Sequence, residues 1–159
     1  MQKITPCLFF NGNAEDAARF YTSVFRHSRF DSEMHFGEGD PGAKRSAMAV
    51  TFVLDGQEFI ALNGGQGMEF TPAISLFVKC ETQEEVDEYW AKLCEGGQPV
   101  QCGWLRDKFG VSWQIVPTAL GAMLQDKDAA KAKRVMNAML KMVKLDLNVL
   151  EQAYRGEAS

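Results

Sequence analysis

The sequence contains an internal repeat, and this repeat constrains the fold more than any other feature. In each half an apolar strand leads into an amphipathic helix, and the helical positions of the two halves keep an offset of 69 residues. The matched pairs are Asn13 with Thr82, Ala17 with Val86, Phe20 with Tyr89, Tyr21 with Trp90, and Val24 with Leu93. A unit that occurs only twice is not a solenoid repeat. We therefore predict two similar half-domains related by a pseudo-twofold axis.

The first half predicts a strand, a helix and a hairpin. An apolar run from Ile4 to Phe10 is typical of a strand, and Asn13 is a suitable N-cap for the helix that follows. A short strand is expected at 29–34, and then a glycine-bearing loop up to residue 45. Strands at 48–54 and 58–62 flank Asp55-Gly56, a dipeptide favoured in tight hairpins because glycine accepts positive φ.

The second half repeats this order and continues into a helical tail. Residues 73–80 predict a strand, and Thr82 with Glu85 forms a capping box for the next helix. Beyond the helix we expect a short strand at 100–102, a loop at 107–110 and an apolar strand at 111–116. Residues 126–144 are rich in Ala, Lys and Met, and Asp146 is placed to cap a last helix that Gly156 ends.

These elements predict an α+β fold of two βαβββ modules that form a curved mixed sheet around a cavity, plus a C-terminal helical tail. The expected boundaries are 1–122 for the domain, with modules at 1–70 and 71–122, and 123–159 for the tail. The chain has 159 residues, 46% of them hydrophobic, and needs no second core. The tail is expected to cover part of the domain or a dimer partner; the alternative is that its methionines dock another protein.

Charge and hydropathy exclude several partners. The net charge is −4, and no dense run of Lys and Arg is present, so nucleic acid is not an expected partner. No apolar stretch approaches the roughly 18 residues of a membrane span, and the N-terminus lacks a signal-peptide core. We expect a cytoplasmic protein with no membrane contact.

The four cysteines have no zinc-site spacing and should stay reduced in the cytoplasm. They are Cys7, Cys80, Cys94 and Cys102.

Several segments resemble one protein family. "FNGNAEDAARFY" in the first half, "CGWLRDKFGVSWQIVPTALGAML" in the second and "KAKRVMNAMLKM" in the tail are similar to the PhnB-like branch of the vicinal oxygen chelate superfamily, which includes glyoxalase I and extradiol dioxygenases. Sequences of this branch are often labelled 3-demethylubiquinone-9 3-methyltransferase domain proteins. The resemblance implies the two-module fold and a homodimer. Because one fold carries many chemistries, the function has to be argued from the site.

The resemblance also indicates where a metal ion would bind. Metal-dependent members place a His on the first strand and a Glu on the last strand of a module. The matching positions here hold neither residue type: Thr5 and Pro6, Ala61 or Leu62, Ile74 and Ser75, and Gln114. A catalytic divalent ion usually needs about three protein ligands. The two histidines, His27 and His35, fall after the first helix and in the loop. We therefore predict no metal ion and no other cofactor.

The methyltransferase label can be compared with the sequence too. An S-adenosylmethionine methyltransferase is expected to have a parallel doubly wound sheet and a glycine-rich turn between its first strand and helix. The turn here, Asn11-Gly12-Asn13, has one glycine. A later glycine cluster at 64–67 follows a hairpin and does not open a helix. The sequence therefore does not predict a site for this cofactor.

With neutral residues at the metal positions, the concavity of the sheet is expected to bind a small hydrophobic or aromatic molecule. Gln114 falls where a metal-binding carboxylate would point inward, and Ser112 shares its face because side chains alternate along a strand. The candidate ligand-binding residues are Gln114, Trp104, Ser112, Phe9, Phe59, Asn63 and Phe70. For each aromatic residue the alternative is a place in the core.

Catalysis by an unknown reaction is the alternative function, and no catalytic residue is identified. Cys102 is the candidate reactive thiol, because nearby Arg106 and Lys108 would make its surroundings electropositive. A buried structural cysteine is the alternative.

Overall fold

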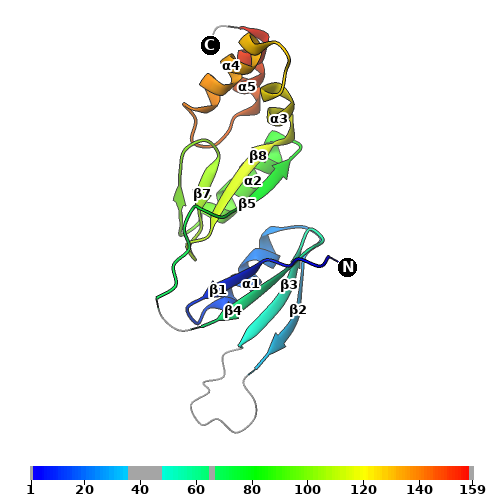
Figure 1. Ribbon diagram of the computed structural model, residues 1–159, viewed down its shortest axis with the longest axis vertical. Coiled ribbons are helices and arrows are strands. Elements are labelled where there is room, and N and C mark those ends of the chain that lie inside the picture. Colours follow the sequence, from blue (N-terminus) through cyan, green and yellow to red (C-terminus); the bar gives the residue numbers. More distant parts are fainter. Residues whose placement is uncertain (1, 36–47, 65–66, 158–159) are drawn as a thin grey trace. The chain divides into compact units, whose positions relative to one another are not determined.

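The structure, a computed structural model, describes residues 2–35, 48–64 and 67–157. The chain divides into two compact units, Met1–Glu69 and Phe70–Ser159, and each is described by itself (Figure 1). Most of the loop predicted to end at residue 45 lies outside the described residues.

Unit 1 is a four-stranded mixed sheet with one helix, α1 (Ala14–Val24). The strand order is β1–β4–β3–β2, with β1 and β4 parallel and the other neighbours antiparallel. The bounds are Cys7–Phe10 for β1, Arg29–Met34 for β2, Ala49–Leu54 for β3 and Gln57–Asn63 for β4. The predicted hairpin is confirmed, because Asp55 and Gly56 connect β3 to β4 with φ of 46° and 83°.

The start of α1 is stabilised from the sheet. Asn13 occupies the predicted N-cap position, but its side chain makes no capping hydrogen bond. Asn63 at the end of β4 supplies one instead: its Oδ1 accepts a hydrogen bond from Ala14 N at 2.9 Å. The first N–H groups of a helix have no partner within the helix, so this bond satisfies one of them.

Unit 2 repeats the arrangement with the strand order β5–β8–β7–β6. The bounds are Ser75–Cys80 for β5, Gln98–Pro99 for β6, Trp104–Arg106 for β7 and Ser112–Pro117 for β8. The helix α2 (Gln83–Cys94) has the predicted cap, since Thr82 Oγ1 accepts a hydrogen bond from Glu85 N at 3.2 Å. Glu85 Oε2 in turn accepts one from Glu81 N at 2.9 Å.

The predicted strand at 100–102 is wrong. These residues form the turn between β6 and β7, where Cys102 and Gly103 have positive φ of 59° and 84°, a conformation that strands do not adopt. The turn bonds to the tail: Cys102 N donates to Met142 O at 2.8 Å, and Gly103 N donates to Val143 O at 2.7 Å.

Three helices follow β8 and gather at the end of the sheet where β5 and β8 finish (Figure 1). They are α3 (Thr118–Leu124), α4 (Ala129–Met139) and α5 (Leu147–Arg155). The sequence did not predict α3, which crosses the expected boundary between 122 and 123. Asp128, two residues after the expected start, caps α4. Asp146 caps α5 as predicted, and Gly156 ends it at a φ of 76°.

The tail is part of the core of unit 2. Its Val135, Leu145 and Leu150 are fully buried against three residues that β8 and α3 contribute, Val116, Leu120 and Met123. Gln83 of α2 adds polar contacts, because its Nε2 donates to Leu145 O at 3.1 Å and its Oε1 accepts from Leu147 N at 2.7 Å. Within the described residues, no helix is long and apolar enough to cross a membrane.

Candidate functional site

The sheet of unit 2 has one face covered by α2. On the other face the tail covers Val116 at one end, and the remainder, around Gln114, is called the open face. Side chains alternate along β8, so Trp113 and Ile115 point to one face and Gln114 to the other. Trp113 and Ile115 are buried, and α2 buries Val86 and Leu93 on the same side. Phe77 of β5, which is 53% exposed, lies on the opposite face with Gln114. This open face carries the candidate site.

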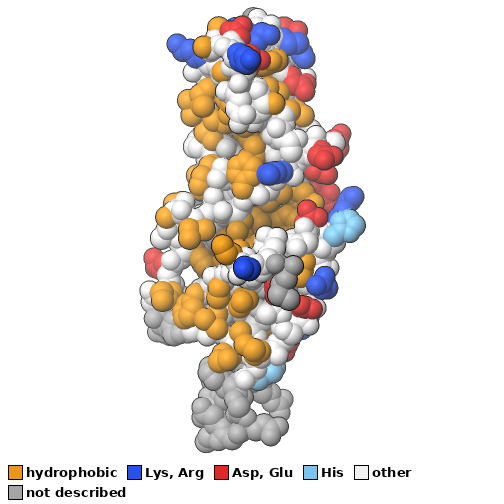
Figure 2. Space-filling view, turned by 45° about the vertical axis from the view of Figure 1, so that its right-hand side comes forward, with side chains coloured by type: hydrophobic (Ala, Val, Ile, Leu, Met, Phe, Trp, Pro, Cys, Tyr) orange, Lys and Arg blue, Asp and Glu red, His pale blue; other side chains and the backbone are white. Residues whose placement is uncertain are grey.

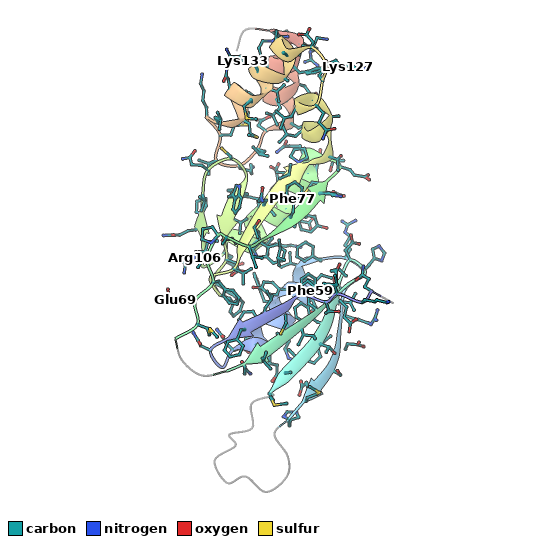
Figure 3. The ribbon with its side chains drawn as sticks, in the orientation of Figure 1. Phe59, Glu69, Phe77, Arg106, Lys127 and Lys133 are labelled. Carbon is teal, nitrogen blue, oxygen red and sulfur yellow. The ribbon has the colours of Figure 1, made fainter. Side chains whose placement is uncertain are left out.

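Gln114 lies at the centre of the open face. The backbone register places it opposite Phe77 on one side and opposite Trp104 of β7 on the other. Residues opposite one another on neighbouring strands have Cβ atoms about 5 Å apart, so a ligand at the amide also reaches both rings. Figure 3 shows Phe77 near the middle of this sheet.

A hydrogen bond orients the Gln114 side chain. Its Nε2 donates to Ser75 Oγ at 2.9 Å, and Ser75 belongs to the neighbouring strand β5. Among the described residues, none donates a hydrogen bond to Gln114 Oε1, so this oxygen is an acceptor for a ligand. Ser112 shares the face, opposite Ser75, but is only 6% exposed.

Two residues of this site were missed from the sequence. From the sequence, Ser75 was considered only as a position that matches a metal ligand in related proteins, and Phe77 was not considered. Alternation along the fifth strand puts both on one face, and that signal is available from the sequence. The register that sets Phe77 beside Gln114 depends on the pairing of strands that are distant in sequence, so it could not be predicted from the sequence.

Asp107 organises the loop before β8. It is 3% exposed, and its Oδ1 accepts hydrogen bonds from Phe109 N at 2.8 Å and Val111 N at 3.0 Å. Its Oδ2 accepts a bond from Trp113 Nε1 at 2.8 Å. The loop therefore fixes the indole on the covered face and sets the start of β8, which positions Gln114 two residues into the strand.

Three predicted site residues, Phe9, Phe59 and Asn63, belong to unit 1. Phe59 lies on the face packed against α1, is 6% exposed and stacks on Phe52 with ring centroids 5.4 Å apart, so it belongs to the core. Phe9 points to the opposite face, where its ring lies directly against Gly64. The side-chain oxygen of Asn63 already caps α1. The core alternative therefore holds for Phe59.

The other two candidates, Phe70 and Cys102, lie in unit 2 outside the strand positions that pair with Gln114. Phe70 is half-buried beside Gly110 in the loop before β8. Cys102 is half-buried in the turn that precedes β7. Arg106 ends β7 at its other end, with its guanidinium against Gly110. The Arg106 guanidinium is therefore directed toward Gly110 at the opposite end of β7 from Cys102.

The residues present do not fit a divalent metal site. On β4 the side chains facing away from α1 are Ile60 and Leu62, whereas Ala61 is buried on the α1 side. On β8 the open-face positions hold Ser112 and Gln114. Across the described ranges, no group of three or more His, Cys, Asp or Glu side chains is placed to hold a metal ion.

Two solved structures with TM-scores above 0.6 support the fold described above. The PhnB protein from Bacillus cereus is 41% identical, with a TM-score of 0.68 over 74% of this chain and 100% of that chain. Protein PA1353 from Pseudomonas aeruginosa is 21% identical, with a TM-score of 0.61 over 74% and 98%. A glyoxalase/bleomycin resistance protein from Albidiferax ferrireducens T118 aligns with 15% identity and a TM-score of 0.46 over 70% and 96%. No curated protein sequence matches the chain.

The two modules have the α+β topology that the sequence predicted. The family model for 3-demethylubiquinone-9 3-methyltransferase matches residues 2–116. The chain therefore belongs to this PhnB-like family. The match ends at β8, before the tail helices.

The family description implies S-adenosylmethionine, and the residues present do not fit that cofactor. In each sheet only one pair of strands is parallel, β1 with β4 and β5 with β8, so no doubly wound parallel sheet is formed. The connection from β1 to α1 contains a single glycine, Gly12, and that from β5 to α2 contains none. Neither turn lets the backbone approach a cofactor as a glycine-rich turn does.

Proposed function

We propose that this protein binds a small hydrophobic or aromatic molecule on the open face of unit 2, around Gln114, without a metal ion. The observation that supports this is an amide held by Ser75 between two aromatic side chains, Phe77 and Trp104. Small-molecule sites commonly combine apolar and aromatic walls with a few placed polar groups.

Two cysteines of unit 2, buried Cys80 and half-buried Cys94, do not favour thiol catalysis. Burial raises the pKa of the Cys80 thiol to about 12, with a smaller contribution from the Glu85 carboxylate. Burial also raises the pKa of Cys94. A catalytic cysteine needs a lowered pKa, because the thiolate is the nucleophile. Neither residue is therefore set up for nucleophilic attack.

Docking of a partner through the tail methionines stays a prediction, and the structure supports it less than ligand binding. Met139 and Met142 are half-buried and pack against the core cluster of unit 2, so Met136, which is 39% exposed, is the most accessible of the three.

The proposal is tested by titrating ¹⁵N-labelled protein with 2-naphthamide, a neutral aromatic amide. We expect saturable shifts of the Gln114 side-chain amide and the Trp104 indole N–H. The loss of one neutral hydrogen bond typically costs about 1 kcal/mol of binding free energy, so Gln114→Leu should weaken binding by about fivefold. The matched control is Gln125→Leu, at an exposed glutamine after α3, which should bind like the unmodified protein.

The absence of saturable shifts, or shifts confined to residues away from Gln114, would overturn the proposal. Stoichiometric Zn²⁺, Ni²⁺, Mn²⁺ or Fe²⁺ in the purified protein would overturn its metal-free part. Saturable binding of S-adenosylmethionine in a calorimetric titration would show that the cofactor fits after all.

A further inference from the structure

The open face of unit 2 carries positive charge and no acidic side chain. Arg106 lies opposite Ser112, and Lys79 lies two residues beyond Phe77 on β5, so both share the face of Gln114. The acidic residues of the module lie elsewhere: Glu81, Glu84, Glu85, Asp87, Glu88 and Glu95 on or next to α2, and Asp107 in its buried loop. This face therefore presents a local positive potential to a ligand.

Neither cation is neutralised by a neighbour. Arg106 and Lys79 are exposed, and within the part of the chain that the structure describes neither forms an ion pair. Lys92 of the same module is different, because it pairs with Glu88 on α2 at 2.8 Å. The positive charge of the open face is thus available to a bound anion.

Arg106 stands at a defined place on this face. Its Nη2 and Nε lie 3.5 and 3.7 Å from the point where a Cβ would stand on Gly110. The guanidinium therefore lies at the end of the face where Ser112 and Ser75 lie, and Figure 3 shows Arg106 beside the end of β7. A guanidinium binds a carboxylate through two parallel N–H···O bonds, so this position suits a planar carboxylate.

We infer, building on the proposed function, that the ligand is an aromatic carboxylate with a planar ring and a single negative charge. Its ring binds between Phe77 and Trp104, its carboxylate binds Arg106, and a polar substituent reaches the amide of Gln114. The aromatic walls select the ring, and the unpaired guanidinium selects the charge.

Two probes with the same ring separate charge from shape. The dissociation constants of 2-naphthoate and 2-naphthamide are measured on the full chain by ¹⁵N NMR titration, and their ratio is the readout. A charge-assisted hydrogen bond at an exposed site should make naphthoate bind about tenfold more tightly. Added NaCl should reduce this preference, because salt screens exposed charges.

Variants assign the preference to Arg106. Arg106→Gln should reduce the ratio to about twofold, while Arg106→Lys, which keeps the charge but loses the planar fork, should give an intermediate ratio. The ratio is insensitive to a general loss of affinity, because both probes experience the same damage. Lys133→Gln on the exposed surface of α4 removes a charge far from β7 (Figure 3) and should keep the full ratio.

Each outcome bears on a different claim. If both probes bind equally, the inference about charge is overturned and the proposed binding site stands. If neither probe binds, the proposed function itself fails. If Arg106→Gln keeps the tenfold preference, the carboxylate is not recognised by Arg106 and the assignment is wrong.

Discussion

Asp107 links a loop, a tryptophan and a strand through a single carboxylate. Turn chemistry alone predicts an Asp in this loop, because Asp accepts bonds from backbone N–H groups two residues on. The bond to the Trp113 indole is not predictable in that way, since it depends on the depth at which the side chain is buried. In the structure Asp107 therefore does more than end a turn.

Asp107→Asn should destabilise the protein by about 1–3 kcal/mol. The amide oxygen keeps the bonds to Phe109 N and Val111 N, but the NH₂ group then faces the Trp113 N–H, and two donors meet. In a Trp113→Phe background the same change should cost at least about 1 kcal/mol less, because the indole donor is gone. Urea unfolding of the unmodified protein, the two single variants and the double variant measures this coupling. An equal loss of unfolding free energy on Asp107→Asn in the two backgrounds would contradict it.

Single residues of the site were predictable only where alternation decides. The shared face of Ser112 and Gln114 followed from the two-residue period of a strand. The position of Phe59 in the core could not be predicted in this way. The alternation shows which residues of β4 share a face with Phe59, but it does not show which of the two faces α1 covers. Asn63 was expected at a ligand and instead caps a helix 49 residues away in sequence, which no local pattern reports.

Helices α2 and α5 were predicted well, because their evidence is local. The capping box at Thr82, the Asp146 cap and the glycine at 156 act within one turn of the helix that they bound. Short elements were predicted poorly. β6 has two residues, β7 has three and α3 has seven, too few for periodicity to be visible in the sequence.

Helix α5 is tied to the connection between α3 and α4 by a titratable pair. Tyr154 Oη donates to Asp126 Oδ2 at 2.5 Å. This bond lowers the pKa of Asp126 and raises that of Tyr154. The lowered pKa contributes stability above the carboxyl's unfolded value and loses it as pH falls through the folded value. The raised pKa contributes stability below the phenol's unfolded value and loses it as pH rises through the folded one.

Tyr154→Phe should therefore destabilise α5 most between about pH 5 and pH 9, where the carboxylate is ionised and the phenol is not. The difference from the unmodified protein should shrink in acid and in strong base. Hydrogen exchange of the α5 amides against pH measures it. Arg155→Gln, which removes an exposed ion pair with Glu157, is the control; an equal Tyr154→Phe effect at pH 3 and pH 7 would contradict the role of the pair.

At the scale of the whole molecule, the tail lies outside the family match but packs against a residue inside it. The family match ends at residue 116, and the Bacillus cereus relative is covered completely by 74% of this chain. Here, however, Val116 packs in one cluster with Val135, Leu145 and Leu150. Charged side chains of both signs surround α4 and α5 at the tail end of unit 2 (Figure 2). The predicted homodimer stays a prediction.

Deleting residues 126–159 should lower the melting temperature and increase binding of a hydrophobic dye, because Val116, Leu120 and Met123 lose the side chains that cover them. A tail that only docked a partner, which is one of the alternatives from the sequence, would leave the core undisturbed after this deletion. Leu145→Ala in the full chain is the graded comparison, with an expected loss of about 2–5 kcal/mol for a buried leucine. An unchanged melting temperature for the shortened chain would show that the tail is dispensable for folding.

The connection between strand and helix differs by one residue in the two halves, and this has a consequence for engineering. The helices start 69 residues apart, at Ala14 and Gln83, but the strands end 70 residues apart, at Phe10 and Cys80. An ungapped alignment of the halves therefore equates buried Phe10 with exposed Lys79. A chimera that exchanges only the strands between the halves by simple counting would place the wrong face of the exchanged strand toward the helix. Such designs must move the turn together with its own strand.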